Sequence, residues 1–213
     1  MGDWESIFKK NGRVFLEDQE DMRGVVQLLK KDKAKKVLDL GCGTGRHTVL
    51  LAKQGFDVYA TDVSDTGLEM TRRWLKHENL SARLKKSSCY ERFPFMDNSF
   101  DAVISTQVIH HNYYEKVKFC ISEIKRVLRP NRLIFITVSA NKYKRRASRF
   151  EMPEQRTYVP LDGEEKGVPH FIYTKTLMKK DFKNFKILSL HKDRGDHWCI
   201  FGRLKEIVQH NNK

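Results

Sequence analysis

The hydrophobic residues of the chain fall into short continuous runs and into longer stretches with helical spacing. A short apolar run is typical of a strand buried on both faces, whereas apolar residues every three or four positions indicate an amphipathic helix. The runs predict strands at residues 35–40, 56–61, 82–86, 100–105 and 133–138. The helical spacing predicts helices at residues 22–29, 45–54, 65–77 and 114–128, the third of them capped by Ser64 or Asp65.

Strands and helices therefore alternate along most of the chain. This alternation predicts an α/β fold, with a doubly wound, mostly parallel sheet, helices on both faces and ligands at the carboxyl ends of the strands. The segments 185–190 and 197–204 flank a turn at Asp193–Asp196, with no helix between them. They predict a C-terminal antiparallel hairpin.

We expect residues 1–213 to form a single domain, because this length suits one compact core. Residues 1–35 are expected to be a cap with an irregular start, and residues 36–138 the cofactor-binding core. Residues 171–213 follow as a helix and the hairpin. The polar segment 140–170 matches no regular element, and a long irregular connection in a compact domain is more often a functional lid than a linker.

The strongest local motif is DLGCGTG at residues 39–45, where a predicted strand turns into a helix. Gly41, Gly43 and Gly45 allow a sharp bend and the close approach of a ligand. A nicotinamide-binding fingerprint would have its third glycine at the position of Arg46, so the spacing disfavours a dehydrogenase. Taken alone, the glycines also fit an ordinary tight turn.

A second acidic residue, Asp62, follows the next predicted strand. An acid at that place can accept the hydroxyl protons of a ribose. Asp39, just before the glycines, supplies another carboxylate at the end of the neighbouring strand. The two acids and the glycine turn together favour a site for a ribosyl ligand.

The sequence VLDLGCGTG resembles motif I of the class I (Rossmann-like) S-adenosylmethionine-dependent methyltransferases. FPFMDNSFDAVIS, QVIHH and EIKRVLRPNRLIFIT resemble later motifs of that family in the same order, and the resemblance covers about residues 36–138. It implies a methyltransferase that binds S-adenosylmethionine and releases S-adenosylhomocysteine. The cofactor-binding residues that it implies are Asp39, Gly41, Cys42, Gly43, Gly45, Asp62, Val63, Ser88, Cys89 and Gln107.

The sequence departs from the family pattern at two places. The family often has an aspartate near Cys89 that accepts the adenine amino proton, and here the stretch is Ser87–Tyr90. We therefore expect the adenine to be held mainly by backbone groups and stacking. Asn131 and Arg132 stand where the family usually has two glycines, which alters a surface turn rather than the pocket.

Three histidines are candidate general bases: His110 and His111 after the fourth predicted strand, and His170 in the lid-like segment. Imidazoles titrate near neutrality, and a base is needed only if the acceptor carries a proton. Hydrogen bonding to the backbone is the alternative role for His110 and His111. We expect no required metal, because tight ligand spacing is lacking at the other histidines considered, His47, His191 and His197.

Composition adds mainly a charge argument. The chain has 41 Lys and Arg against 27 Asp and Glu, a formal net charge of +14 that concentrates anionic partners. The sequence has no apolar stretch that suits a membrane helix or a signal peptide, so we expect a soluble, cytoplasmic protein that binds no membrane. The four widely spaced cysteines predict reduced thiols rather than disulfides.

The methyl acceptor stays open between an anionic or small-molecule metabolite, which we slightly favour, and tRNA. A metabolite suits a short chain without a recognisable RNA-binding domain. The basic run at residues 142–146 fits RNA as well as it fits a solvated loop. The IHH and DRGDHW stretches are also similar to enzymes that esterify carboxymethyl groups on the wobble uridine of tRNA. A non-catalytic cofactor- or RNA-binding module is a third hypothesis, and the oligomeric state is not predicted.

Overall fold

The computed structural model describes residues 4–14, 16–140 and 148–206. Its helices are α1 (Trp4–Asn11), α2 (Met22–Lys31), α3 (Arg46–Lys53), α4 (Asp65–His77), α5 (Tyr114–Val127) and α6 (Lys175–Asp181). Its strands are β1 (Lys36–Leu40), β2 (Asp57–Asp62), β3 (Arg83–Lys86), β4 (Phe100–Thr106), β5 (Leu128–Ser139), β6 (Phe150–Glu154), β7 (Thr157–Pro160), β8 (His170–Phe171), β9 (Phe185–Lys192) and β10 (His197–Leu204).

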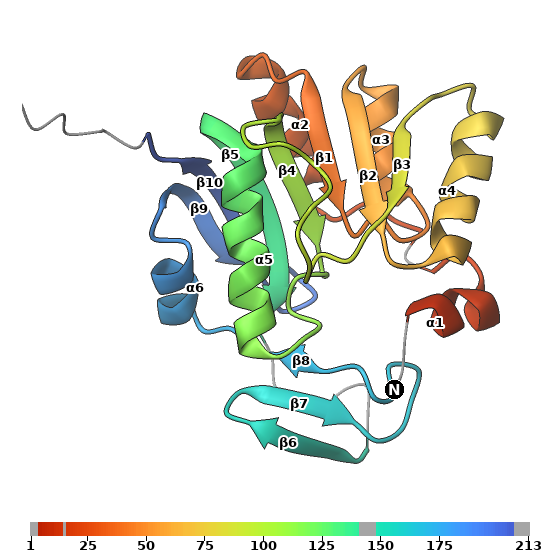
Figure 1. The fold of residues 1–213 in the computed structure, drawn as a ribbon, viewed down its shortest axis with the longest axis vertical. Helices are drawn as coiled ribbons and strands as arrows, with labels where there is room; N and C mark the ends of the chain where they lie inside the picture. Colours follow the sequence, from red (N-terminus) through yellow and green to blue (C-terminus); the bar gives the residue numbers. More distant parts are fainter. Residues whose placement is uncertain (1–3, 15, 141–147, 207–213) are drawn as a thin grey trace, which may run out of the picture.

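Seven strands form the main sheet, in the order β3-β2-β1-β4-β5-β10-β9 (Figure 1). The first five of these are parallel to one another, and β10 pairs antiparallel with both β5 and β9. The expected doubly wound sheet and its C-terminal hairpin are thereby confirmed. Because the strand order reverses between β1 and β4, the carboxyl ends of these two strands open onto a crevice where a ligand can bind.

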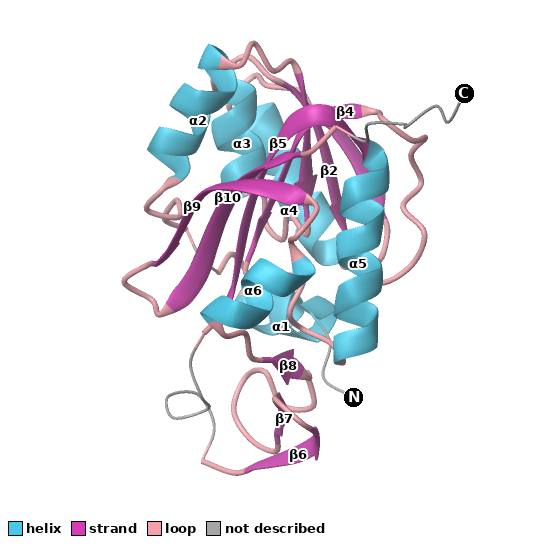
Figure 2. Cartoon of the chain, turned by 90° about the vertical axis from the view of Figure 1, so that its left-hand side faces the viewer, coloured by secondary structure: helices cyan, strands magenta, loops and turns pink. Residues whose placement is uncertain are grey.

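Helices cover both faces of the sheet, with α2 and α3 on one side and α5 on the other (Figure 2). On the first side, Met22 and Leu29 of α2 pack with Leu51 of α3 against the strands. On the second side, α5 and α6 pack against Leu38, Val103 and other strand residues. The side chains of residues 133–138 are fully buried because the strand is covered on both faces, as the apolar run predicts.

β5 begins at Leu128, five residues earlier than the sequence predicts. The sequence places a break at Pro130 and Asn131, and the structure accommodates both residues in an irregularity of the strand. Phe100 pairs with Leu128 and Ala102 with Leu133, so β5 contains extra residues over this short span of β4. A bulge of this kind keeps the strand paired across residues that disfavour regular strand geometry.

The start of the described chain is helical, and the expectation of an irregular start is wrong there. α1 buries Ile7 and Phe8, and the Glu5 carboxylate accepts hydrogen bonds from Ser64 Oγ at 2.6 Å and from Thr66 Oγ1 at 2.7 Å. An eight-residue helix is marginal by itself in water. Its attachment to the start of α4, which local sequence cannot show, therefore stabilises it.

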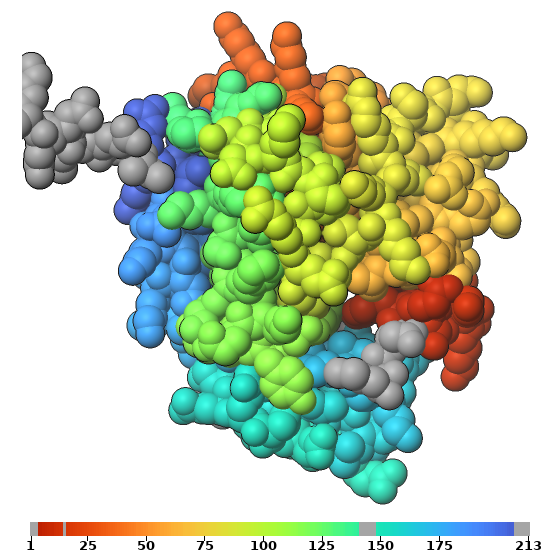
Figure 3. Space-filling view, in the orientation of Figure 1, coloured from red at the N-terminus to blue at the C-terminus, as the bar shows by residue number. Residues whose placement is uncertain are grey.

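The lid-like segment is more regular than the sequence predicts, because β6, β7 and β8 form a three-stranded antiparallel sheet. Figure 3 shows the residues of this segment as a cyan layer beneath the green residues of α5. The strands have only two to five residues each and include Pro153 and Pro160, so the hydrophobic pattern has too few repeats to reveal them. The basic run at 142–146 lies outside the described residues.

None of the helices that the structure describes combines the length and apolar character needed to span a membrane.

Candidate active site

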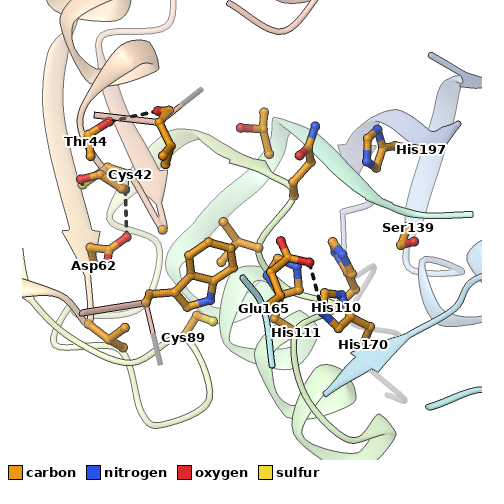
Figure 4. Close-up of a pocket in the computed structure, with 18 of the residues that line it drawn as sticks. Cys42, Thr44, Asp62, Cys89, His110, His111, Ser139, Glu165, His170 and His197 are labelled. Carbon is orange, nitrogen blue, oxygen red and sulfur yellow. Dashed lines mark hydrogen bonds and ion pairs between the residues drawn. The ribbon is translucent and has the colours of Figure 1, made fainter. Parts of the chain in front are cut away.

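A cavity of about 390 Å³ lies at the carboxyl ends of β1, β2 and β4 (Figure 4). Its walls come from residues far apart in the sequence, from Trp4 in α1 to His197 in β10. The volume lies within the range of small-molecule sites. Its place matches the crevice that the strand order predicts.

The glycine turn begins directly at the end of β1. The backbone N–H groups of Gly41 and Cys42 both donate to the carbonyl of Thr61, at 2.8 and 2.9 Å, which ties the turn to the end of β2. Gly41 has a φ of 76°, and a Cβ at this position would lie 2.4 Å from the Val108 side chain. Only glycine fits here without moving the loop after β4.

Gly45 has a packing role beside the ligand contact that the family resemblance implies. It precedes α3 with a φ of 94°, and a Cβ there would lie 2.7 Å from Thr71 Oγ1 in α4. Gly45 is not part of the cavity lining among the described residues, whereas Gly41, Cys42 and Gly43 are. Gly45 therefore allows α3 to pack close to α4, and its contact with the cofactor stays a prediction.

Asp62 lies at the end of β2 and lines the cavity, as expected. Its Oδ2 accepts a hydrogen bond from Gly43 N at 2.8 Å and its Oδ1 accepts one from Ser64 N at 2.9 Å. Burial raises the pKa of this carboxyl above its usual range. An ionised carboxylate has about four acceptor sites, so these two bonds leave capacity for hydroxyl donors of a ligand.

Asp39 lies behind the turn and is 2% exposed. It accepts a hydrogen bond from Thr48 Oγ1 at 2.6 Å, and burial raises its pKa to about 6. Among the described residues, Asp39 and Ser88 are absent from the cavity lining. In this structure Asp39 joins β1 to α3 rather than facing the cavity.

Other residues that the resemblance implies do line the cavity: Val63, Cys89 and Gln107. Gln107 has a left-handed backbone with a φ of 59°, held by its N–H, which donates to Thr137 Oγ1 at 2.9 Å. Such strain in a residue other than glycine is concentrated at functional sites. Strand β5 thus fixes the loop that carries Gln107 into the cavity.

Two aromatic side chains of α1, Trp4 and Phe8, form a wall that the sequence reasoning missed. Their ring centroids are 5.8 Å apart, and Trp4 also lies 5.0 Å from the His111 ring. The spacing of four residues between them is a helical signal, and it was available in the sequence. It was overlooked because the first residues were expected to be irregular.

His47 provides a further polar contact of the cavity wall. Its Nε2 accepts a hydrogen bond from the backbone N–H of Gln19 at 3.1 Å, and its Nδ1 lies 3.0 Å from Thr106 Oγ1. The ring is therefore neutral with its proton on Nδ1, which donates to Thr106. Burial accounts for this state, because it lowers the pKa of His47 to about 3.

The three candidate bases meet on one wall, across the cavity from Cys42 and Asp62 (Figure 4). The ring centroids of His110 and His111 are 4.0 Å apart, and those of His111 and His170 are 4.7 Å apart. Glu165 Oε2 lies 3.4 Å from His170 Nε2. We call these three histidines the histidine wall. Sequence reasoning selected all three but gave no sign that Glu165 accompanies them.

The chain resembles known proteins in sequence and in fold. Residues 37–131 match the family described as "Methyltransferase domain". This match identifies residues 37–131, a little under half of the chain, as a methyltransferase domain. A demethylmenaquinone methyltransferase of Tropheryma whipplei is 29% identical over 147 residues, which are 68% of this chain and 56% of that protein. The chain thus matches only about half the length of this curated relative.

Solved structures support the fold of the methyltransferase domain. The PH0226 protein of Pyrococcus horikoshii superposes with a TM-score of 0.73 at 24% identity, over 93% of this chain and 100% of the other. A SAM-dependent methyltransferase of Methanosarcina mazei has the same TM-score at 18% identity, over 90% of this chain and 100% of the other. These likenesses confirm the predicted fold, and the family match over residues 37–131 agrees with the predicted S-adenosylmethionine-dependent methyltransferase domain.

Proposed function

We propose that this protein transfers the methyl group of S-adenosylmethionine to a small-molecule acceptor bound against the histidine wall. The observation that carries the proposal is the single cavity that runs from the glycine turn and Asp62 to His110, His111 and His170. Donor and acceptor must lie in contact for a methyl group to pass directly between them. One cavity with a ribose-binding side and an imidazole side meets this requirement.

The residues present fit the cofactor. Asp62 is an acceptor-only group at a strand end, which suits the paired hydroxyls of a ribose. Val63 and Cys89 provide the apolar surroundings that an adenine needs where an aspartate partner is lacking. The turn at Gly41 and Gly43 lets backbone approach the amino acid end closely.

The bound cofactor supplies an electrophilic methyl group on a sulfonium, so the protein itself has little covalent chemistry to perform. Its residues hold the two reactants in line, which contributes several kcal/mol through orientation. A new bond forms between the acceptor atom and the methyl carbon while the bond from carbon to sulfur breaks. Where the acceptor carries a proton, we propose that an imidazole of the histidine wall accepts it.

Two observations support a small acceptor. The related protein of Tropheryma whipplei is named for a demethylmenaquinone substrate. The side of the cavity opposite the cofactor residues is closed by Tyr158 and Glu165 of the small-sheet segment together with His170. A bounded pocket of this size suits a compact acceptor group.

RNA is the second candidate acceptor. Arg194 is 96% exposed in the turn whose next residues, Gly195 and Asp196, line the cavity. With the net charge of +14, this arginine offers a phosphate contact beside the cavity mouth.

The acceptor is tested with methyl-labelled S-adenosylmethionine, supplied with a low-molecular-weight cell extract and, separately, with total tRNA. We expect label in the extract, with transfer that changes little between low and moderate salt. Label found only in tRNA, with rates that fall steeply with salt, would replace the metabolite by RNA. Transfer to neither fraction would contradict the proposed function.

A further inference from the structure

The histidine wall has more imidazoles than proton transfer requires. One base is sufficient to accept a proton from an acceptor, yet three rings and a carboxylate meet here. We propose that His110, His111 and His170 form a three-histidine site for a zinc ion, with Glu165 as the group that orients His170. This site goes beyond the proposed function and does not depend on which acceptor is used. Where zinc is bound, the three imidazoles are its ligands, and the ion replaces the imidazole base by lowering the pKa of an acceptor that carries a proton.

The backbone holds the three residues together from two distant parts of the chain. His110 and His111 lie in the loop between β4 and α5, and His170 begins β8. The N–H of Phe171 donates to the carbonyl of His110 at 2.7 Å, which joins the small sheet to that loop beside the rings. The N–H of His111 donates to the carbonyl of Val108 at 3.0 Å and fixes the loop further.

The ring nitrogens are close enough to share one ion. Each histidine offers a nitrogen, and the three nitrogens lie within 4.8 Å of one another. In a tetrahedral site with Zn–N bonds of about 2.0–2.1 Å, ligand nitrogens are about 3.3 Å apart. The χ2 angle of histidine has a broad range, so small ring rotations can close the difference.

The surroundings of His170 match those of metal ligands. A histidine that binds a metal through one nitrogen usually donates its other N–H to a carboxylate, which fixes the ring. Glu165 Oε2 is 3.4 Å from His170 Nε2, and the two residues are 8% and 3% exposed. Tyr158 stacks on the His170 ring at 4.7 Å and restricts its orientation further.

The ligand set and its place favour zinc with an open coordination position. Neutral imidazoles suit borderline-soft divalent ions, and catalytic zinc sites use three protein ligands with a fourth position left for water or substrate. All three histidines line the cavity that also contains the cofactor-binding residues. An ion held there would present its fourth position to an acceptor oxygen and draw negative charge toward it.

A second group of possible ligands provides a control within the same chain. Asp21, His191 and Cys199 also have ligand atoms within 4.8 Å of one another. Their geometry is already accounted for, because His191 Nε2 lies 3.1 Å from Asp21 Oδ2 and Gln19 Nε2 donates to Cys199 Sγ at 3.6 Å. His191→Ala therefore tests whether any bound zinc lies at this other cluster.

The test is calorimetric titration of chelator-treated full-length protein with zinc chloride, without cofactor or acceptor. We expect one equivalent of zinc to bind. His170→Ala and His111→Ala should each weaken the zinc affinity by more than about 100-fold, and Glu165→Gln should weaken it by about 10-fold. His191→Ala should leave the affinity within about twofold. Cobalt titrated in place of zinc should give the visible absorption of a tetrahedral site in the unaltered protein and in His191→Ala, and not in His170→Ala.

Stability measurements accompany the titration. Zinc should raise the thermal unfolding midpoint of the unaltered protein and of His191→Ala, because an ion that binds only the folded state stabilises it. Circular dichroism identifies any variant that fails to fold, in which case His111→Gln takes its place. The proposal is overturned if the unaltered protein binds no stoichiometric zinc, or if binding survives His170→Ala and is lost in His191→Ala.

Discussion

Gly41 shows how one backbone position constrains the whole site. It combines a positive φ with contact against Val108, the residue after Gln107 in the loop that follows β4. A side chain at this position would both strain the turn and push away the loop that carries Gln107 and the histidine wall. The distance between the cofactor side and the acceptor side therefore depends on the lack of a side chain here.

Gly41→Ala should lower the free energy of unfolding by more than the cost of placing an alanine in a left-handed backbone conformation. A left-handed alanine costs about 1–2 kcal/mol, and displacing Val108 adds about 1–3 kcal/mol. Gly55→Ala is the matched control, because Gly55 has a φ of 85° with no atom within 4 Å of the added Cβ. Urea unfolding of both variants separates the two costs, and equal losses of stability would mean that the contact with Val108 contributes nothing.

Asp62→Asn should weaken the binding of S-adenosylhomocysteine by about tenfold or more, since the hydroxyl donors of a ribose would meet an amide in place of a carboxylate. Asparagine keeps one oxygen to accept from Gly43 or Ser64, so the turn should remain folded. Calorimetry gives the affinity. Asp57→Asn is the control, because Asp57 is exposed at the other end of β2. This variant should leave the affinity for S-adenosylhomocysteine unaltered. Equal affinity in the two variants would exclude Asp62 from the cofactor site.

At the scale of elements, the sequence predicts what periodic patterns can encode. The strands of the parallel sheet and the helices between them have enough repeats to be recognised, and their bounds differ from prediction mostly by one or two residues. The β6–β8 sheet has too few residues for a pattern, and α1 offers only the four-residue spacing of Trp4 and Phe8. The stability of α1 depends on distant partners such as Ser64 for Glu5. Glu165 was missed for the same reason, because only the tertiary fold places it beside His170.

His47 connects three elements, and its burial has a cost that depends on pH. It lies in α3, accepts from the segment before α2 and contacts Thr106 at the end of β4. Its pKa falls from 6.5 to about 3 on folding because the buried ring resists protonation. Below pH 6.5 the unfolded chain therefore takes up a proton that the folded chain does not, and stability present above that pH is lost as the pH falls toward 3.

His47→Gln should remove this part of the acid sensitivity. The difference in unfolding free energy between the two proteins should change by up to about 1.4 kcal/mol for each pH unit below 6.5, in the direction that favours the variant in acid. Asp39 changes the unfolding free energy with pH in the opposite direction, up to about pH 6. Because both proteins contain Asp39, its contribution cancels in the difference between them. Denaturant unfolding at about pH 7 and pH 5 measures the difference. His77→Gln, an exposed change at the end of α4, should show no such change.

At the scale of the whole molecule, the small sheet and the main sheet share the cavity between them. Tyr158 and His170 come from the small sheet, whereas Gly41, Asp62 and Gln107 follow strands of the main sheet. A ligand that contacts both parts must stabilise their association, because it binds only when they are together. The lid function predicted for residues 140–170 stays a prediction that ligand binding can test.

Limited proteolysis should detect that association. Residues 148–171 should be cleaved more slowly when S-adenosylhomocysteine is present, and more slowly still with an acceptor, because closure excludes water and protease alike. Mass spectrometry of the fragments locates the cuts. Cleavage near the exposed Arg72 of α4 serves as the internal control and should not change. Equal protection at both places would indicate general stabilisation without a lid.

The strand order also has a consequence for biosynthesis. β10 is inserted between β5 and β9, and it brings His197 to a cavity that Trp4 also lines. A chain still attached to the ribosome, with residues 197–204 inside the exit tunnel, can assemble the parallel strands but lacks one wall of the pocket. Ligand capture by a nascent chain would thus report that residues 197–204 have left the tunnel, and stalled products ending before β10 should expose the edge of β5 to chaperones.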